Sequence, residues 1–156
     1  MISVGKALGS GVPIGAALVA ERVAQTISAG DHGSTYGGNL LATRAAAFVL
    51  QQLTEGGLIE HVKTVGAHFE KRLRALALKH PVIVEVRGAG VMRGLQLAVD
   101  AVPVVDQARE RGLLVNRTDE KVVRLLPPLT IEAADIDRAV DVLDEVFAAI
   151  PAEVPA

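Results

Sequence analysis

Glycine recurs through residues 1–40 far more densely than through the rest of the chain. Glycine gives the backbone access to positive φ and lets it approach another group closely, so such a segment favours loops over regular elements. Only residues 14–20 have the apolar character of a strand. A loop-rich stretch of this length is uncommon in a compact domain unless it serves a site. We therefore expect residues 1–40 to be one edge of a larger unit that continues upstream, and to hold a ligand.

The next part of the chain changes from helical to strand-like spacing of apolar residues. Helical spacing runs from Leu40 to about Lys79 with a break at residues 56–57, which predicts two helices. The period then becomes two, which predicts a hairpin over residues 82–99 with its turn at residues 88–90.

Residues 100–112 predict a short helix, and a second hairpin is expected from strands at residues 113–116 and 122–126. Pro127 ends the second strand because proline cannot donate to the ladder, and Thr130 is expected to cap a final helix. The apolar stripe of this helix consists of Ile136, Val140, Leu143, Phe147 and Ile150.

The same helix carries an acidic run, which is interpreted as its solvated face: Glu132, Asp135, Asp137, Asp141, Asp144 and Glu145. The tail, residues 151–156, is expected to fray.

Together these elements predict an α/β chain in three parts. Residues 81–156 form a small α+β domain of antiparallel strands covered by helices, because each apolar face must be buried against another layer. Residues 56–80 are a connecting helix, and residues 1–55 are the tail end of a larger domain.

Composition excludes several classes of function. With 16 basic and 18 acidic residues the chain has no electrostatic footprint for nucleic acid or an anionic membrane. Cysteine is absent, which removes disulfides, thiolate zinc sites and thiol catalysis. His32 has no partner at metal-ligand spacing, so no metal site is expected. No secretory signal or membrane-length apolar run is found, and the expected location is the cytoplasm.

Lys6 is the first candidate for chemistry, in the segment GKALGSGVPIGAALV that begins at Gly5. A lysine among glycines can be approached by a planar ligand, and partial desolvation lowers the pKa of such an amine enough for attack on a carbonyl. From spacing alone a solvated lysine is the favoured interpretation. A P-loop is excluded, because there the lysine follows the glycines and precedes Ser or Thr.

The second candidate is GDHGSTYGGNLLATRAA, which begins at Gly30 and leads into the helix expected from Leu40. The hydroxyls of Ser34 and Thr35, together with amides at a helix N-terminus, are the components of a phosphate site. An ordinary turn with Asn39 as the N-cap is the plainer alternative, and composition favours it.

These two segments resemble the cofactor-lysine and phosphate segments of class III aminotransferases, which use pyridoxal 5'-phosphate (PLP). The resemblance continues in order through EVRGAGVMRGLQL and RGLLVNRTDEKVVRLLPPLTI, and so covers nearly the whole chain. Within the family the chain is most similar to the members that handle acetylornithine and ornithine. The fold implied is the C-terminal part of a PLP-dependent transferase of fold type I.

The resemblance also implies roles for individual residues. Lys6 would hold the cofactor covalently and move a proton, and Thr35, supported by Ser34, would bind the cofactor phosphate from the neighbouring subunit of a homodimer. Arg124 would bind the substrate carboxylate, for which a planar guanidinium suits better than lysine. Without the resemblance, a surface ion pair is an equal interpretation of Arg124.

The activity implied is transfer of an amino group from N-acetylornithine or a related ω-amine to 2-oxoglutarate, as in arginine biosynthesis. The family's cofactor-ring contacts lie upstream of the lysine, so this chain alone is expected to be inactive. A competing hypothesis is a cofactor-free binding or assembly module that keeps only the small-domain fold and a dimer surface. A nucleotide-binding domain is disfavoured, because the Walker spacing is absent.

Overall fold

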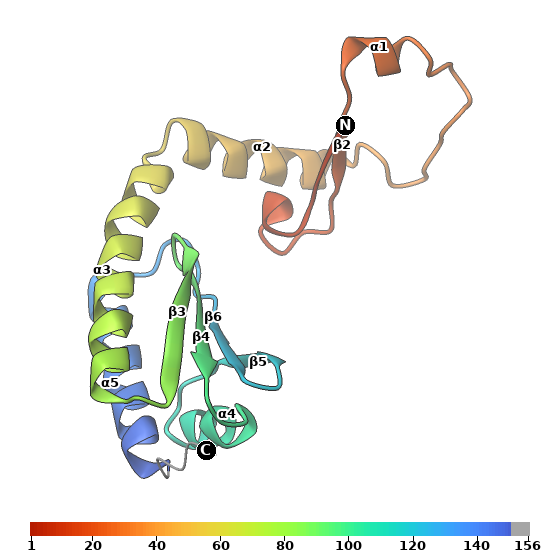
Figure 1. Cartoon of the computed structure of the whole chain (residues 1–156). Helices are drawn as coiled ribbons and strands as arrows, with labels where there is room; N and C mark the ends of the chain where they lie inside the picture. Colours follow the sequence, from red (N-terminus) through yellow and green to blue (C-terminus); the bar gives the residue numbers. More distant parts are fainter. Residues whose placement is uncertain (151–156) are drawn as a thin grey trace. The chain divides into compact units, whose positions relative to one another are not determined.

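The computed structural model describes residues 1–150, and the chain divides into two compact units, Met1–Leu58 and Ile59–Ala156 (Figure 1). The expected frayed tail lies outside the described residues. The division falls at the start of the second long helix, so that helix belongs with the sheet that follows it. Within residues 1–150 no helix is long and apolar enough to cross a membrane.

The first unit consists of short elements around one longer helix. Strand β1 (Ile2–Val4) pairs antiparallel with β2 (Ala16–Leu18), and between them lies the 3-10 helix η1 (Lys6–Gly9). A single turn, α1 (Glu21–Ala24), precedes an irregular segment that ends at α2 (Leu40–Thr54). Strand β1 was not predicted, because three residues are too few to show alternation.

Helix α2 begins where the sequence predicted. The Oδ1 atom of Asn39 accepts hydrogen bonds from the amides of Leu41 and Ala42, each at 3.1 Å, which confirms Asn39 as the N-cap. The helix packs against η1 with Ala42 and Ala46 buried. Helix α2 therefore contacts the turn that carries Lys6, and the segment that carries Ser34 and Thr35 leads into its first residue.

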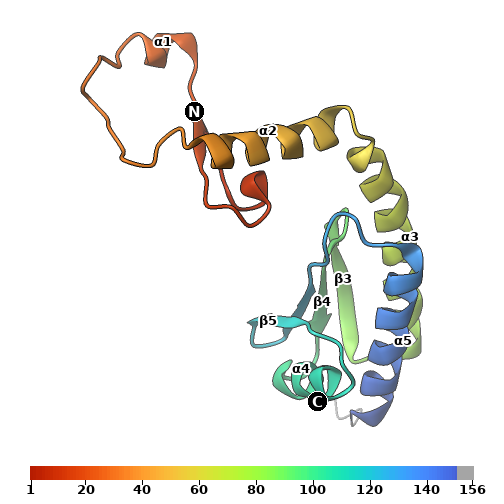
Figure 2. The same cartoon turned by 180° about the vertical axis from the view of Figure 1, so that it is seen from behind.

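The second unit is a four-stranded antiparallel sheet covered by helices, as predicted. Its strands lie in the order β3-β4-β6-β5, with two long helices on one side of the sheet (Figures 1 and 2). In chain order its elements are α3 (Leu58–Lys79), β3 (Ile83–Ala89), β4 (Met92–Leu97), α4 (Val102–Glu110), β5 (Asn116–Asp119), β6 (Val122–Leu125) and α5 (Ala133–Ala149).

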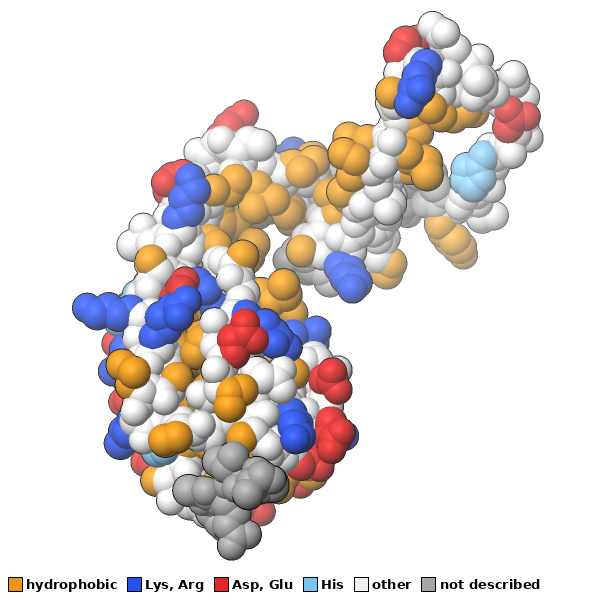
Figure 3. Space-filling view, viewed as in Figure 1, with side chains coloured by type: hydrophobic (Ala, Val, Ile, Leu, Met, Phe, Trp, Pro, Cys, Tyr) orange, Lys and Arg blue, Asp and Glu red, His pale blue; other side chains and the backbone are white. Residues whose placement is uncertain are grey.

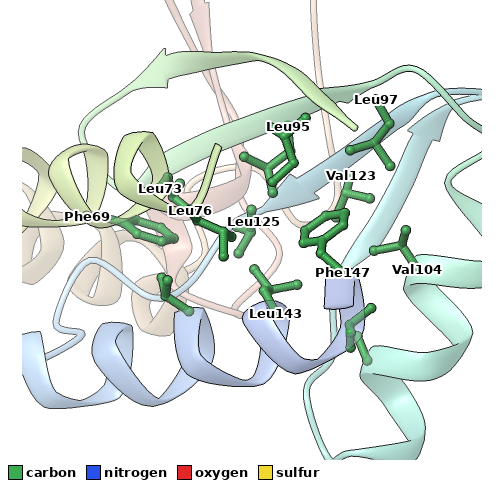
Figure 4. Packing of buried hydrophobic residues seen from close by; sticks show 14 of the residues in the cluster. Phe69, Leu73, Leu76, Leu95, Leu97, Val104, Val123, Leu125, Leu143 and Phe147 are labelled. Carbon is green, nitrogen blue, oxygen red and sulfur yellow. The ribbon is translucent and has the colours of Figure 1, made fainter. Parts of the chain in front are cut away.

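One hydrophobic core lies between the sheet and these helices. Figure 4 shows side chains from α3, β4, β6 and α5 converging, with Val104 contributed by α4. The predicted stripe of α5 is confirmed, since Ile136, Val140, Leu143 and Phe147 are buried. The other labelled members are Phe69, Leu73, Leu76, Leu95, Leu97, Val123 and Leu125.

Two glycines shape the first hairpin. The expected turn at residues 88–90 is wrong in register, because β3 continues to Ala89 and pairs it with Met92. Gly88 lies inside the strand with φ of 130°, where an added Cβ would meet the Met92 carbonyl oxygen at 2.1 Å. An added Cβ at Gly66 of α3 would lie 2.7 Å from the Gly90 carbonyl oxygen, so helix and turn approach closely there.

The second strand of the second hairpin, β6, lies where it was predicted, but the first strand lies further along the chain. This first strand is Asn116–Asp119 instead of residues 113–116, so the polar segment forms an exposed edge strand. Leu113 and Val115 are instead packed, partly buried, against the core without joining the sheet. The apolar residues at alternate positions here are therefore partly buried beside the sheet and are not part of a strand.

Two expectations for α5 were wrong. Thr130 does not cap the helix; the N-cap position is Glu132, without a side-chain bond, because a turn from Pro128 to Ile131 intervenes. The acidic run is not all solvated face, because three of its carboxylates pair with basic side chains of α3: Asp137, Asp141 and Asp144. Basic residues at matching spacing on α3 were the signal that could have revealed this seam.

Candidate active site

Lys6 is held in an uncommon backbone conformation. It is the first residue of η1, its φ is 51°, and the residue is exposed. Among residues 1–150 the only other non-glycine residue with positive φ is Ser10, at the end of the same turn, with φ of 47°. Such conformations cost roughly 1–3 kcal/mol each and concentrate at functional sites. This strain marks η1 independently of the glycine pattern.

Ser34 and Thr35 lie in the irregular segment between α1 and α2. The Ser34 Oγ accepts a hydrogen bond from the amide of Gly37 at 3.1 Å, so the segment turns just before Asn39. Both residues are exposed. The hydroxyl of Thr35 and the nearby glycine amides are donors that suit a phosphate.

The structure does not bring Lys6 together with Ser34 and Thr35 inside one chain. Figures 1 and 2 show the segment between α1 and α2 extending away from η1. A single ligand could join these groups only if the hydroxyls met the lysine of another chain, or if the loop moved.

Arg124 lies on β6 in the second unit and is half-buried. Its Nη2 donates to Asn116 Oδ1 at 3.4 Å, while its Nε is buried and has no hydrogen-bond partner among residues 1–150. A buried donor without a partner is costly, because its hydration is lost and not replaced. The guanidinium therefore retains capacity for an acceptor, and a carboxylate matches its fork.

A cavity of about 220 Å³ adjoins Arg124. Its wall is largely apolar, with Arg124, Asn116 and Asp135 as the polar members, and Asp135 also pairs with Arg138. An apolar pocket with a few placed polar groups is the usual form of a small-molecule site. The remaining lining residues are Phe69, Leu113, Leu114, Val115, Leu125, Leu126, Pro127, Ile131, Ile136 and Ala139.

Within residues 1–150 no group of three or more His, Asp and Glu side chains is placed to hold a metal ion.

Lys6 belongs to the first unit and Arg124 to the second.

Comparison with known proteins defines the class. The family model described as aminotransferase class-III matches residues 1–147. The chain therefore belongs to the class III aminotransferases. The solved structures it resembles are enzymes of this kind, so the two units are parts of an aminotransferase fold.

Two of the relatives that the chain matches are acetylornithine aminotransferases. The chain is 45% identical over 147 residues to an acetylornithine aminotransferase of Aquifex aeolicus, covering 94% of this chain and 37% of that protein. It is 43% identical to an acetylornithine aminotransferase of Methanothermobacter thermautotrophicus, covering 93% and 37% of the two proteins.

Among solved structures, an ornithine aminotransferase of Toxoplasma gondii superposes with a TM-score of 0.86 at 34% identity, over 95% of this chain and 36% of that one. That structure has PLP at partial occupancy in its active site. An acetylornithine aminotransferase of Elizabethkingia anophelis gives a TM-score of 0.85 at 28% identity, with 95% and 38% covered. The chain thus spans well under half the length of the relatives it matches.

Proposed function

We propose that this chain is the cofactor-lysine and C-terminal part of a PLP-dependent aminotransferase. The enzyme would transfer an amino group from N-acetylornithine or a related ω-amine to 2-oxoglutarate, in arginine biosynthesis. The observation that carries the proposal is the placement of Lys6, exposed and strained at the head of η1 in a class III aminotransferase chain. The acetylornithine relatives support this choice of amino donor.

The groups present suit the cofactor. The Lys6 amine provides the nucleophile for an aldehyde, and Ser34, Thr35 and neighbouring amides provide donors for a phosphate. When bound, PLP supplies an electron sink for the electron pair at the substrate carbon. Lys6 would hold the cofactor through its Nζ, and the same amine would carry the proton at the substrate carbon.

A homodimer is part of the proposal. The separation of Lys6 from the segment of Ser34 and Thr35 within one chain is what a phosphate site shared between two subunits requires. In that arrangement Thr35 of one subunit binds the phosphate of the cofactor held by Lys6 of the other.

Arg124 would bind the carboxylate of the amino donor or of the 2-oxo acid. Its unpartnered Nε and the adjoining cavity support this role, because a carboxylate would satisfy the buried donor. The Nη2 of Arg124 donates to Asn116 Oδ1, so the incoming acid would meet a guanidinium that is already partly oriented.

The test of the proposal is selective labelling of Lys6. The purified chain is titrated with PLP, reduced with borohydride and mapped by mass spectrometry. Saturable labelling at Lys6 is expected, lost in Lys6→Ala and kept in Lys71→Ala, which removes an exposed lysine of α3. Labelling spread over surface lysines and unchanged by Lys6→Ala would refute the cofactor role. We expect no steady transamination by this chain alone, and its detection would contradict that expectation.

A second candidate is an assembly module that ignores PLP. The observation in its favour is the exposed apolar surface of the first unit, where hydrophobic side chains gather over the β1–β2 hairpin and α2 (Figure 3). Leu40, Leu41 and Phe48 are 87%, 71% and 55% exposed. Patches of this kind mark protein interfaces. Light scattering that shows a stable oligomer without PLP, of a size that added PLP does not change, would favour this candidate. Unselective lysine labelling would support it as well.

A further inference from the structure

We propose that Asn116 is a positioning residue that sets the guanidinium of Arg124 for carboxylate binding. This inference rests on the carboxylate-binding role proposed for Arg124. It adds a residue on the neighbouring strand, and the side-chain amide of this residue sets the orientation of the arginine guanidinium.

The sheet places the two side chains on one face. Asn116 of β5 is directly opposite Arg124 of β6, and directly opposite residues of an antiparallel pair project to the same side. The Asn116 Oδ1 accepts from Arg124 Nη2 at 3.4 Å, and both residues line the same cavity. An arginine side chain loses conformational entropy when a ligand holds it in one orientation. A cross-strand acceptor restricts the side chain before the ligand binds, so less entropy is lost on binding.

The partner of Arg124 on β4 is Gly94, which has no side chain, and Arg87 of β3 follows next in the same row. The Arg87 side chain covers Gly94, because a Cβ added there would lie 3.6 Å from the Arg87 Cγ. Arg87 is paired with Glu85 at 2.9 Å. Within this row, Asn116 is therefore the acceptor that contacts Arg124.

Asn116 is suited to this role because it is neutral. An aspartate there would also accept from Arg124, but its charge would compete with the carboxylate of the ligand. Asp135 is the charged acceptor that lines the cavity, and its pairing with Arg138 draws it toward its own helix. A neutral acceptor orients the arginine while leaving its charge for the ligand.

The experiment is a titration of the isotopically labelled full chain with 2-oxoglutarate, followed by amide and arginine Nε–H signals in NMR. Matched sodium chloride and a neutral diamide serve as ligand controls. The wild type is expected to show saturable shifts at β5 and β6 that are lost in Arg124→Gln. We expect Asn116→Ala to weaken binding about threefold to tenfold, the scale of one lost hydrogen bond to a charged group. Asn116→Asp should weaken binding as well.

The matched control is Thr118→Ala, an exposed residue of the same strand, which should bind like the wild type. A merely structural role for Asn116 would not move the Arg124 Nε–H signal, whereas a positioning role shifts it in Asn116→Ala before ligand is added. Unchanged affinity and an unchanged Nε–H signal in Asn116→Ala would overturn the inference while the Arg124 site stands. Absence of ligand-induced shifts in the wild type would overturn both the role of Asn116 and the proposed Arg124 site. The cofactor role of Lys6 would still be tested separately, by the labelling experiment.

Discussion

Arg93 shows how one buried side chain ties two elements together. It is 5% exposed, and its guanidinium donates to the carbonyl oxygens of Gly90 and Gly66, each at 2.9 Å, and to Glu70 Oε2 at 3.0 Å. Hydrogen bonds from Arg74 and the charge of Arg93 hold the pKa of Glu70 below its usual range. The arginine thereby fastens α3 to the turn of the first hairpin.

Replacement of Arg93 by Met should destabilise the second unit by about 3 kcal/mol, because carbonyl oxygens in the interior lose their donor. Urea unfolding followed by circular dichroism measures the effect. Arg109→Met is the matched control, since Arg109 is exposed and its ion pair within residues 1–150 is with Asp106 of its own helix. This substitution should change stability by less than about 0.5 kcal/mol. Equal effects of the two substitutions would show that Arg93 does not fasten the hairpin.

Sequence reasoning at the residue scale succeeded where a local signal existed. The Asn39 cap was predictable because capping depends on side-chain chemistry next to an apolar run. The strain at Lys6 was not, because φ is set by η1 and its neighbours. The pair of Asn116 and Arg124 was not predictable either, because the first strand of the second hairpin was expected at residues 113–116 instead of Asn116–Asp119.

At the scale of elements, α3 and α5 meet along a polar seam beside the core. Each contact joins a basic side chain of α3, or of His80 directly after it, to an aspartate of α5. Lys79 and His80 both contact Asp144. The hydrogen bond from Lys79, and then that from His80, hold the pKa of Asp144 below its usual range. The other pairs are His68 with Asp137, Arg72 with Asp137 and Arg72 with Asp141.

This seam predicts a loss of stability in acid. A carboxylate whose pKa is lowered by folding stabilises the native state above its unfolded pKa, and the contribution disappears as pH falls through the folded pKa. Asp144→Asn should therefore lower Tm near pH 7, and the difference from wild type should shrink below about pH 4. Melting curves between pH 7 and 3 test this. Glu145→Gln, its more exposed neighbour, is the control, and a difference that is constant with pH would contradict the prediction.

The long helices were predictable because apolar spacing over many turns leaves little ambiguity. Strand β5 was not, since it is polar and exposed and the apolar residues before it serve the core instead. The acidic face of α5 was misread because its partners lie on α3, more than sixty positions away in the chain. Pairings at that distance are set by packing, which no local pattern records.

For the molecule as a whole, the core is concentrated in the second unit. Within the first unit, burial is confined to Gly9, Ala42 and Ala46, whereas the second unit buries a continuous cluster that includes Phe69, Leu95 and Phe147. Local stability follows buried contacts. The first unit is thus expected to be the less stable part of this chain.

Hydrogen exchange should display this contrast. Amides of β4, β6 and α5 should be the slowest to exchange, and those of residues 25–39 should exchange much faster, because all of these residues are exposed and their hydrogen bonds belong to isolated turns. Mass spectrometry of peptides after timed labelling measures it. Equal protection of residues 25–39 and β4 would contradict the prediction. Addition of PLP should slow exchange in the first unit if Lys6 labelling is selective.

The division of the chain also bears on how such an enzyme changes over time. Lys6 and the proposed phosphate donors belong to one unit, and Arg124, the proposed carboxylate-binding residue, belongs to another that has its own core. Substitutions around β5 and β6 that alter which acid is recognised can therefore accumulate without changing the turn that carries Lys6. Selection for a new substrate and selection for retained chemistry act on separate stretches of the gene, which is a favourable starting point for laboratory evolution by segment exchange.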